Sequence, residues 1–381
     1  MKIVHLCLSC FFIDDYSYQE NMLPKYHVKM GHDVTVIASL VSFNKEGKPC
    51  LLPSPTVRID EDGYKVIRLE YKKPVRINKV LRRFRGLYEA LKKEAPDIIF
   101  THGVSLADAT TIVKYLKNNP SVKLYGDNHA DYINSATNLL SKHILHKMIW
   151  RHYAKKMEPY LTKCYGVTPM RCRFLREMYH LNPEFIEFLP MGVDDEAIPV
   201  NRAEVRDSVR KELGIPNDSF LIMTGGKIDV RKNTHVLLEA IKCVGNSNLH
   251  LVICGVLAPE MEYLKERFDC NIHYLGWCNA QRVMDCMVAS DMACFPGTHS
   301  TLWEQAVGVG LPVVLKRWNE MTHMDINGNC VFVGGEDVEE LQQVISRMLS
   351  EEYYLKQKGK AEIAASSFLY SDIAKKAIEL C

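Results

Sequence analysis

SFLIMTGGKIDVRKNTHVLLEAIK, residues 219–242, is the stretch that decides the fold. It begins with a continuous apolar run, which is typical of a strand buried on both faces. Apolar residues return at helical spacing over residues 236–241, where Asn233 or Thr234 is expected to cap a helix. Between strand and helix lie two glycines and three cations, namely Gly225, Gly226, Lys227, Arg231 and Lys232. Cations beside amides that glycine leaves accessible suit a diphosphate, although a solvated turn can have the same composition.

The same alternation of apolar strands and helix-length segments runs through the whole chain. Before residue 190 the strand-like runs are KIVHLCLS, HDVTVIAS, YKVIRLEY, PDIIFTHG, VKLYGDNH and KCYGVTP. After residue 219 they are SFLIMTGGK, LHLVICGV, NIHYLGW, DMACFPG, LPVVLKRW and NCVFVGG. Apolar strands between helices predict parallel sheets with both faces covered. We therefore expect an α/β protein with two Rossmann-like, doubly wound domains facing a central cleft, and ligands beyond the carboxyl ends of the strands.

The length of 381 residues exceeds what one hydrophobic core usually covers. A Pro-Met-Gly turn followed by acidic residues places the hinge near residues 190–195. The predicted domains are residues 1–190 and 191–360, and a helix over 361–381 is expected to pack late and to cross back to the first domain.

The composition is that of a soluble globular protein, with 47% hydrophobic and 25% charged residues. The sequence contains no apolar run of about 18 residues and no signal-peptide pattern. The 13 cysteines are scattered, which suits a reducing compartment, so we expect a cytoplasmic protein. Residues 1–190 contain 29 Lys and Arg but only 19 Asp and Glu, so we expect this half to bind anionic surfaces.

A second motif is DMACFPGTHSTLWEQAVGVGLPVVLKRW, residues 291–318. It predicts a strand, a short loop and a helix whose N-terminus can bind phosphate oxygens. One turn into this helix, Glu304 could accept hydrogen bonds from a sugar hydroxyl, or it could simply be a carboxylate stabilised by the helix dipole. The Walker pattern and the dinucleotide G-x-G-x-x-G pattern are both absent, which disfavours nucleotide triphosphatases and dehydrogenases.

Taken as an ordered set, GGK…RKN, PGTHSTLWEQAVGVGLPVV, LPMGVD and KIVHL…KMGHDVTVIAS resemble glycosyltransferase family 4. The resemblance implies the GT-B fold, a nucleotide-diphosphate sugar as donor (UDP-sugar first), no cofactor, no metal, and transfer with retention of anomeric configuration. In that family a G-R-x4-K pattern binds the donor diphosphate. Gly226, Lys227 and Lys232 match it, with Lys227 in place of Arg.

The E-x7-E signature that follows in this family is broken here. Gln305 stands where the second Glu usually falls, Glu304 is one residue early, and the loop before them is short. We therefore expect loop residues to contact the donor instead. The predicted donor-binding residues are Gly225, Gly226, Arg231, His299, Ser300, Thr301, Leu302, Glu304 and Gln305.

On the acceptor side, LYGDNHADYIN offers His129 at the end of a strand, with Asp127 and Asp131 nearby. The resemblance implies that such a histidine approaches the reacting sugar, so His129, Lys227 and Lys232 are the predicted catalytic residues. A purely structural His129 is the alternative, and His102 is the reserve candidate. In the loop after the first strand we expect Tyr16, Tyr18, Gln19 and Glu20 to contact a glycan or lipid-linked acceptor.

Residues 72–93 form a basic and apolar segment, which predicts peripheral contact with the inner face of a membrane. The alternative is a solvated helix face. Nucleic acid is not expected, because no recognition motif accompanies these cations. The cations of this segment include Lys72, Lys73, Arg76, Lys79, Arg82, Arg83 and Arg85.

The favoured function is hexosyl transfer to a hydroxyl of a glycan or lipid-linked acceptor in cell-surface polysaccharide synthesis. One alternative is a nucleotide-sugar epimerase, which can share the same architecture. The other is a non-catalytic subunit that binds a nucleotide sugar, as the eroded E-x7-E signature would allow.

Overall fold

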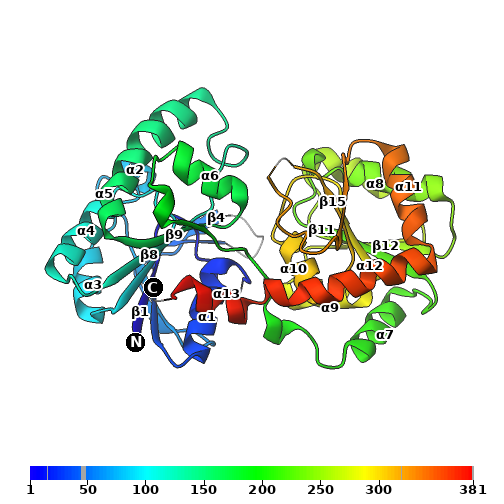
Figure 1. Cartoon of the computed structure of the whole chain (residues 1–381), viewed down its shortest axis with the longest axis horizontal. Coiled ribbons are helices and arrows are strands. Elements are labelled where there is room, and N and C mark those ends of the chain that lie inside the picture. Colours follow the sequence, from blue (N-terminus) through cyan, green and yellow to red (C-terminus); the bar gives the residue numbers. More distant parts are fainter. Residues whose placement is uncertain (15, 44–48, 319, 380–381) are drawn as a thin grey trace. The chain divides into compact units, whose positions relative to one another are not determined.

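The computed structural model describes residues 1–14, 16–43, 49–318 and 320–379. The chain forms two compact units. Unit 1 consists of Met1–Pro190 and the described part of Ile373–Cys381, and unit 2 is Met191–Asp372. Each unit has one main sheet with helices against it (Figure 1).

The sheet of unit 1 has the strand order β10-β9-β8-β7-β1-β2-β6-β5. Its pairs are parallel except β5 with β6, and the central strand β1 pairs with β2 through Ile3 and Val34 and with β7 through Ile3 and Ile98. The strands are β1 (Lys2–Cys7), β2 (Asp33–Ser39), β5 (Val57–Ile59), β6 (Lys65–Leu69), β7 (Ile98–His102), β8 (Lys123–Asn128), β9 (Leu161–Gly166) and β10 (Ile186–Phe188). A separate antiparallel ribbon pairs β3 (Val41–Phe43) with β4 (Pro49–Leu51).

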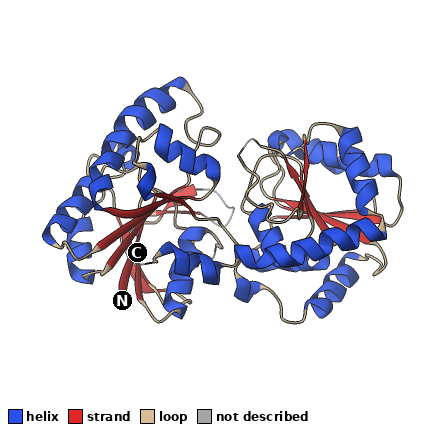
Figure 2. Ribbon diagram, in the orientation of Figure 1, coloured by secondary structure: helices blue, strands red, loops and turns tan. Residues whose placement is uncertain are grey.

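Helices lie on both faces of this sheet, as the apolar strands require (Figure 2). They are α1 (Gln19–Lys29), α2 (Val75–Leu81), α3 (Leu87–Glu94), α4 (Ala109–Asn118), the π-helix η1 (Ser141–Trp150), α5 (Arg151–Met157), α6 (Pro169–Glu177), and the short turns η2 (Glu158–Tyr160) and η3 (Pro183–Phe185). The helix α13 (Tyr370–Ala377) contains the division between the units, and its residues from Ile373 onward belong to unit 1.

The sheet of unit 2 is entirely parallel, with the order β13-β12-β11-β14-β15-β16. Its strands are β11 (Phe220–Gly225), β12 (Leu249–Cys254), β13 (Ile272–Gly276), β14 (Met292–Phe295), β15 (Val313–Lys316) and β16 (Cys330–Val333). An apolar cluster lies against each face of this sheet.

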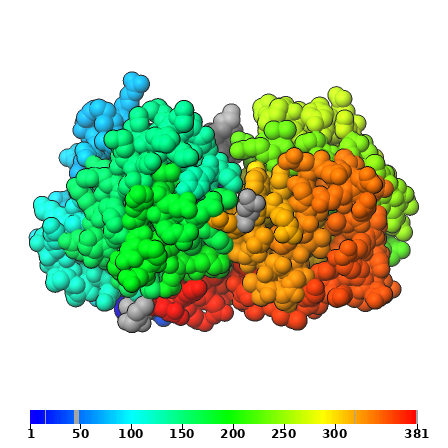
Figure 3. Space-filling view, turned by 45° about the horizontal axis from the view of Figure 1, so that its top comes forward, coloured from blue at the N-terminus to red at the C-terminus, as the bar shows by residue number. Residues whose placement is uncertain are grey.

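The helices of unit 2 complete the layers around the sheet, and residues of α11 and α12 contribute to the orange and red-orange surface in Figure 3. They are α7 (Arg202–Leu213), α8 (Thr234–Val244), α9 (Ala280–Ala289), α10 (Leu302–Val309), α11 (Val338–Met348), α12 (Glu351–Ala364), η4 (Asp195–Ala197), η5 (Val230–Lys232), η6 (Pro259–Arg267) and η7 (Ala365–Phe368). Two Rossmann-like α/β units with parallel sheets confirm the expected fold class. In the described part of the chain, every helix is too short or too polar to cross a bilayer.

Candidate functional site

The turn after β11 brings the basic loop against the neighbouring strand. Gly226 has φ of +103°, a conformation that favours glycine, and its N–H donates to the Cys254 carbonyl at 2.9 Å. A Cβ built on Gly225 would lie 2.5 Å from that same carbonyl oxygen. Gly225 is therefore required by the close approach of the ends of β11 and β12, and Gly226 by its backbone conformation. They hold the following loop at the carboxyl edge of the sheet.

Lys232 reaches from this loop to the segment before α10. Its Nζ donates to the Thr298 carbonyl at 2.6 Å and to the His299 carbonyl at 3.4 Å. Partial burial lowers the pKa of the Lys232 ammonium to about 8, although Asp229 opposes this effect. The structure thus places one cation beside the loop that leads into the N-terminus of α10, where an anion is favoured.

The other two predicted cations are placed differently. Arg231 donates to the Asp229 carboxylate from Nη2 at 2.6 Å and from Nε at 3.2 Å, so its charge is neutralised within the loop. Lys227 is exposed. Of the three cations, Lys232 is the one that the fold directs toward residues 298–299.

Glu304 is held by two histidines in a buried cluster. Its side chain is 0% exposed, and its Oε1 accepts hydrogen bonds from His299 Nε2 at 2.8 Å and from His323 Nε2 at 3.0 Å. Burial would raise the pKa of the Glu304 carboxyl, but the two imidazoles hold it well below its usual range. Besides the helix dipole, two direct hydrogen-bond partners thus stabilise the Glu304 carboxylate.

Several polar atoms around Glu304 remain without a hydrogen bond among the described residues. They are Oε2 of Glu304, Oγ of Ser300 and Nε1 of Trp303, and each is buried. Thr301 precedes α10, Leu302 begins it, and Gln305 is buried in its first turns. Polar groups buried without partners are uncommon, and a polar ligand that reaches this loop would satisfy them.

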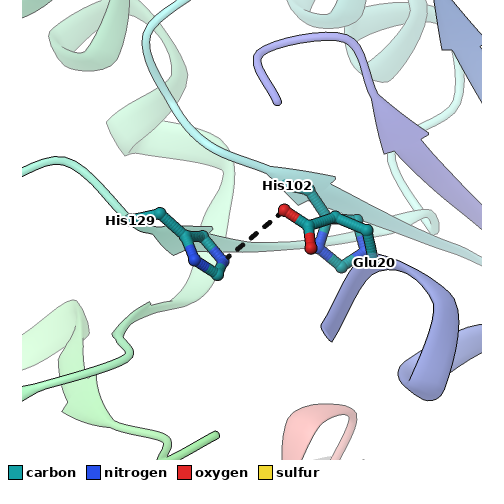
Figure 4. A group of neighbouring side chains, drawn as sticks. All are labelled: Glu20, His102 and His129. Carbon is teal, nitrogen blue, oxygen red and sulfur yellow. Dashed lines mark ion pairs between the residues drawn. The ribbon is translucent and has the colours of Figure 1, made fainter. Parts of the chain in front are cut away.

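In unit 1 the carboxyl ends of β7 and β8 gather a second polar cluster. Asp127 is buried at the end of β8 and accepts from Gly103 N–H and from His102 Nδ1, both at 2.9 Å. His129 Nε2 lies 3.4 Å from Asp127 Oδ2 and 4.0 Å from Glu20 Oε1. Glu20 and His129 point toward one another beside His102 (Figure 4). The structure thus brings the catalytic candidate His129 together with its reserve, His102.

The remaining acceptor-side predictions separate into two groups. Asp131 is engaged by the fold, because it accepts from the Ile133 and Asn134 amides at 2.8 and 2.7 Å and from Arg171 Nε at 3.1 Å. Its carboxylate thus holds the turn that follows β8, and its contact with the acceptor stays a prediction. Gln19 is 1% exposed, and neither polar atom of its side chain finds a partner among the described residues.

The aromatic part of the predicted acceptor loop forms a small group. The rings of Tyr16 and Tyr18 lie 5.1 Å apart, and Tyr16 contacts Phe43 edge to face at 5.8 Å. Tyr18 remains 37% exposed. It is therefore accessible to a ligand, whereas Tyr16 is half-buried.

Three functional candidates were not found by sequence reasoning. His323 follows β15 and is 19 residues from Glu304, and no motif linked the two. His5 and His27 are buried and hydrogen-bonded in line with His102. His5 interrupts an otherwise apolar run, which is a signal that could have pointed to it, whereas His27 and His323 stand in stretches of mixed polarity.

The basic segment 72–93 is only partly available for a partner. Arg82 is not a surface cation: its Nη1 donates to the Ser105 carbonyl at 2.6 Å and its guanidinium lies 5.1 Å from the Trp150 ring. Arg83 donates to Tyr153 and Arg85 pairs with Glu70. Within this segment, α2 combines exposed apolar residues with exposed cations. The apolar residues are Val75, Ile77 and Val80, and the cations are Arg76 and Lys79.

Among the residues that the structure describes, two groups have the donor types of a transition-metal site. They are Glu20 with His102 and His129, and His299 with Glu304 and His323, and in each the ligand atoms lie within 4.8 Å of one another. Hydrogen bonds already account for the second group, because both imidazoles donate to one carboxylate oxygen.

Comparison with known proteins gives two family matches, one in each unit. The Glycosyltransferase Family 4 model matches residues 23–197, and the Glycosyl transferases group 1 model matches residues 205–364. A similar curated protein is UDP-Gal:alpha-D-GlcNAc-diphosphoundecaprenol alpha-1,3-galactosyltransferase of Escherichia coli. It is 26% identical over 279 residues, which are 68% of this chain and 65% of that protein.

Solved structures show the same fold at lower identity. Sucrose-phosphate synthase from Thermosynechococcus elongatus has a TM-score of 0.69 at 14% identity, covering 98% of this chain and 96% of that one. The Anabaena protein HepE, solved in complex with UDP and glucose, has a TM-score of 0.67 at 14% identity, covering 99% and 98%. These similarities extend over both units.

Proposed function

We propose that this chain, which is a glycosyltransferase of the GT-B fold, transfers a hexose from a UDP-sugar to a hydroxyl of a lipid-linked glycan, with retention of configuration. The lipid-linked acceptor and a role in cell-surface polysaccharide synthesis are suggested by the name of the Escherichia coli relative. A UDP donor is suggested by that name and by the UDP complex of HepE.

One observation carries the proposal: the Lys232 ammonium is fixed at the Thr298 carbonyl, beside the N-terminus of α10. A cation and a helix N-terminus together favour an anionic group. In transfer, the bond from the anomeric carbon to the diphosphate breaks and negative charge grows on the leaving phosphate. Lys232 then stabilises the transition state more than the ground state, which is the condition for catalysis.

The acceptor step needs no protein nucleophile. The acceptor oxygen bonds to the anomeric carbon on the face that the diphosphate leaves, and its proton passes to the departing diphosphate. Glu304, His299 and the partnerless Ser300 Oγ are proposed to contact the donor, and His129 to donate a hydrogen bond to the donor sugar. Tyr18, Gln19 and Glu20 are proposed to contact the acceptor.

A nucleotide panel tests the proposal most directly. Thermal unfolding is measured with UDP, GDP, ADP and TDP and their sugars, and a bound nucleotide stabilises by about 2.7 kcal/mol at 100 times its Kd. UDP is expected to stabilise the wild type. Lys232→Ala should lose most of the effect, while Lys242→Ala, an exposed lysine on α8, should retain it. Stabilisation by none of the nucleotides would exclude the proposal.

Product analysis separates transfer from the alternatives. With a UDP-sugar alone, release of an isomerised nucleotide sugar would instead identify an epimerase. Binding without turnover in the presence of lipid-linked acceptors would favour a non-catalytic subunit.

We also propose that α2 contacts an anionic membrane surface, where such an acceptor would be presented. Val75, Ile77 and Val80 are 44%, 57% and 60% exposed, and Arg76 and Lys79 lie among them. Apolar residues interspersed with cations are typical of interfacial helices. Flotation with anionic vesicles should fall after Ile77→Glu with Val80→Glu, but not after Leu355→Glu on α12 of unit 2. Equal flotation of all proteins would exclude this surface.

A further inference from the structure

A line of four hydrogen-bonded groups crosses the interior of unit 1. Asp127 Oδ2 contacts His102 Nδ1 at 2.9 Å, and His102 Nε2 contacts His5 Nδ1 at 3.0 Å. His5 Nε2 contacts His27 Nδ1 at 2.9 Å, and His27 Nε2 contacts the Ala374 carbonyl at 2.9 Å. The three imidazoles and the carboxylate are each 0% exposed, so water does not enter the line.

The two ends of this line determine how many protons it must contain. The Ala374 carbonyl can only accept, and an ionised Asp127 can only accept. Four contacts therefore require four N–H groups. Three neutral imidazoles supply only one N–H each, so the line needs one proton more than neutral histidines provide.

We infer that the fourth proton makes His102 a buried imidazolium paired with the Asp127 carboxylate, and that His102 acts as a positioning residue for His129. His102 is the only ring of the three that contacts the carboxylate, and a charge on His5 or His27 would lie one or two rings farther away. Asp127 also accepts from Gly103 N–H and has His129 Nε2 3.4 Å from Oδ2, and these donors favour its ionised form.

The titratable groups that face His102 agree with this assignment. They are His5 and Cys7 on β1, Glu20 on α1, Asp127 on β8 and His129 just after β8. Burial opposes the charge, but Cys7, Asp127 and Glu20 raise the pKa of His102 to about 9. Burial lowers the pKa of His5 well below its usual value and that of His27 to about 4, so both are neutral at pH 7.

The directions of all four hydrogen bonds follow from this charge. His27 donates to Ala374, His5 donates to His27, and His102 donates to His5 and to Asp127. Asp127 consequently stays ionised and can orient the His129 ring, whose Nε2 lies 3.4 Å from its Oδ2, as a carboxylate orients a catalytic histidine. This role of His102 rests on the proposed function of His129, whereas the proton count does not.

Nuclear magnetic resonance of the chain labelled with ¹⁵N-histidine tests the proton count without any substrate. Two-bond ¹H–¹⁵N correlations distinguish an imidazolium from either neutral tautomer. At pH 8 ordinary histidines are neutral, so one persistent imidazolium signal is expected. His250 and His273 in unit 2 are an internal control. His250 Nδ1 lies 3.1 Å from His273 Nε2, and the pKa of each imidazole is lowered, so both should be neutral at pH 8.

Two matched variants assign the signal. In Asp127→Asn the amide N–H can donate to Nδ1 of a neutral His102, so the fourth proton is no longer needed and the signal should disappear. Asp131→Asn changes a nearby carboxylate outside the line and should keep the signal. Absence of a persistent imidazolium in the folded wild type, or its survival in Asp127→Asn, would overturn the inference.

The positioning role is tested by turnover of the UDP-sugar identified in the nucleotide panel. His102→Asn should lower kcat by about 10- to 100-fold and change its pH profile, with little change in KM for the donor. An unchanged kcat with an unchanged pH profile would exclude the positioning role of His102. The proton count is tested separately, by the magnetic resonance experiment. Failure of the nucleotide panel itself would instead count against the proposed function.

Discussion

Lys232 carries a charge that its surroundings make dependent on pH. Its pKa is lowered to about 8 by partial burial, whereas an exposed lysine titrates near 10.4. Below pH 8 the ammonium is charged and can bind a diphosphate; above it the neutral amine cannot. The charge of the UDP diphosphate is constant above about pH 7, because its last phosphate proton has a pKa near 6.

We therefore predict that UDP binds more weakly as the pH rises through 8. Affinity should fall by roughly tenfold per pH unit above about 8.5, until the pKa of the complex is reached. Isothermal titration from pH 6.5 to pH 9.5 measures this fall. Lys232→Arg should bind with nearly constant affinity, because arginine remains charged. The same pH dependence in that variant would assign the titration to another group.

At the scale of single residues, the sequence indicates which residue types lie in the loop after β11. It does not indicate how the fold arranges them. The glycines and lysines after β11 were identified, but Lys227 and Lys232 could not be distinguished, because only the fold shows which one reaches Thr298. The pairing of Arg231 with Asp229 spans two residues and could have been foreseen. The contact of Glu304 with His323 depends on how the loop after β15 folds back, which no local pattern encodes.

Gly297 joins two elements of the donor-side site. A Cβ built on it would lie 2.3 Å from the Arg231 carbonyl oxygen and from Lys232 Cα, so a side chain would force the two loops apart. The contact of Lys232 Nζ with the Thr298 carbonyl depends on this approach. Gly359 in α12 is the opposite case, because nothing lies within 4 Å of its built Cβ.

We predict opposite effects from the same substitution at these two glycines. Gly297→Ala should destabilise unit 2 by roughly 1–3 kcal/mol and weaken UDP binding, because overpacked loops must shift. Gly359→Ala should stabilise by roughly 0.5–1 kcal/mol, because alanine favours a helix interior, and should leave binding unchanged. Urea unfolding followed by tryptophan fluorescence, with UDP titration, measures both. Normal UDP binding by Gly297→Ala would show that the close approach of the two loops is not needed for binding.

Among the elements, the parallel strands were predictable because they are continuous apolar runs. The ends of the helices were less predictable. Asn233 or Thr234 is expected to cap α8. Asn233 stands at the N-cap, but it has φ of +53° and its side chain donates to the Pro296 and Gly335 carbonyls at 3.1 and 2.8 Å instead of capping the helix. The basic segment was read as one amphipathic stretch, but α2 ends where Arg82 adopts φ of +55° and its guanidinium enters the interior.

For the whole molecule, the last described residues are part of the core of unit 1, although they are farthest along the chain. Ile373, Ala374, Ala377 and Ile378 are all buried. Tyr125 Oη donates to the Glu379 carbonyl at 2.9 Å and Tyr165 Oη to the Lys376 carbonyl at 3.1 Å. The Ala374 carbonyl also terminates the histidine line. Removal of this segment would thus remove the main-chain carbonyls to which His27 and the two tyrosine hydroxyls donate.

We predict that deletion of residues 373–381 destabilises unit 1 selectively. The loss should exceed about 3 kcal/mol, since two buried isoleucines contribute roughly 1.5–3 kcal/mol each and orphaned polar groups add to the cost. Hydrogen exchange read by mass spectrometry should show faster exchange in β1, α1, β7 and β8, with β11 and β12 unchanged. Glu379→Ala keeps its main-chain carbonyl and should exchange like the wild type. Equally faster hydrogen exchange in both units, or unchanged exchange in both, would contradict the conclusion that the C-terminal segment completes the core of unit 1.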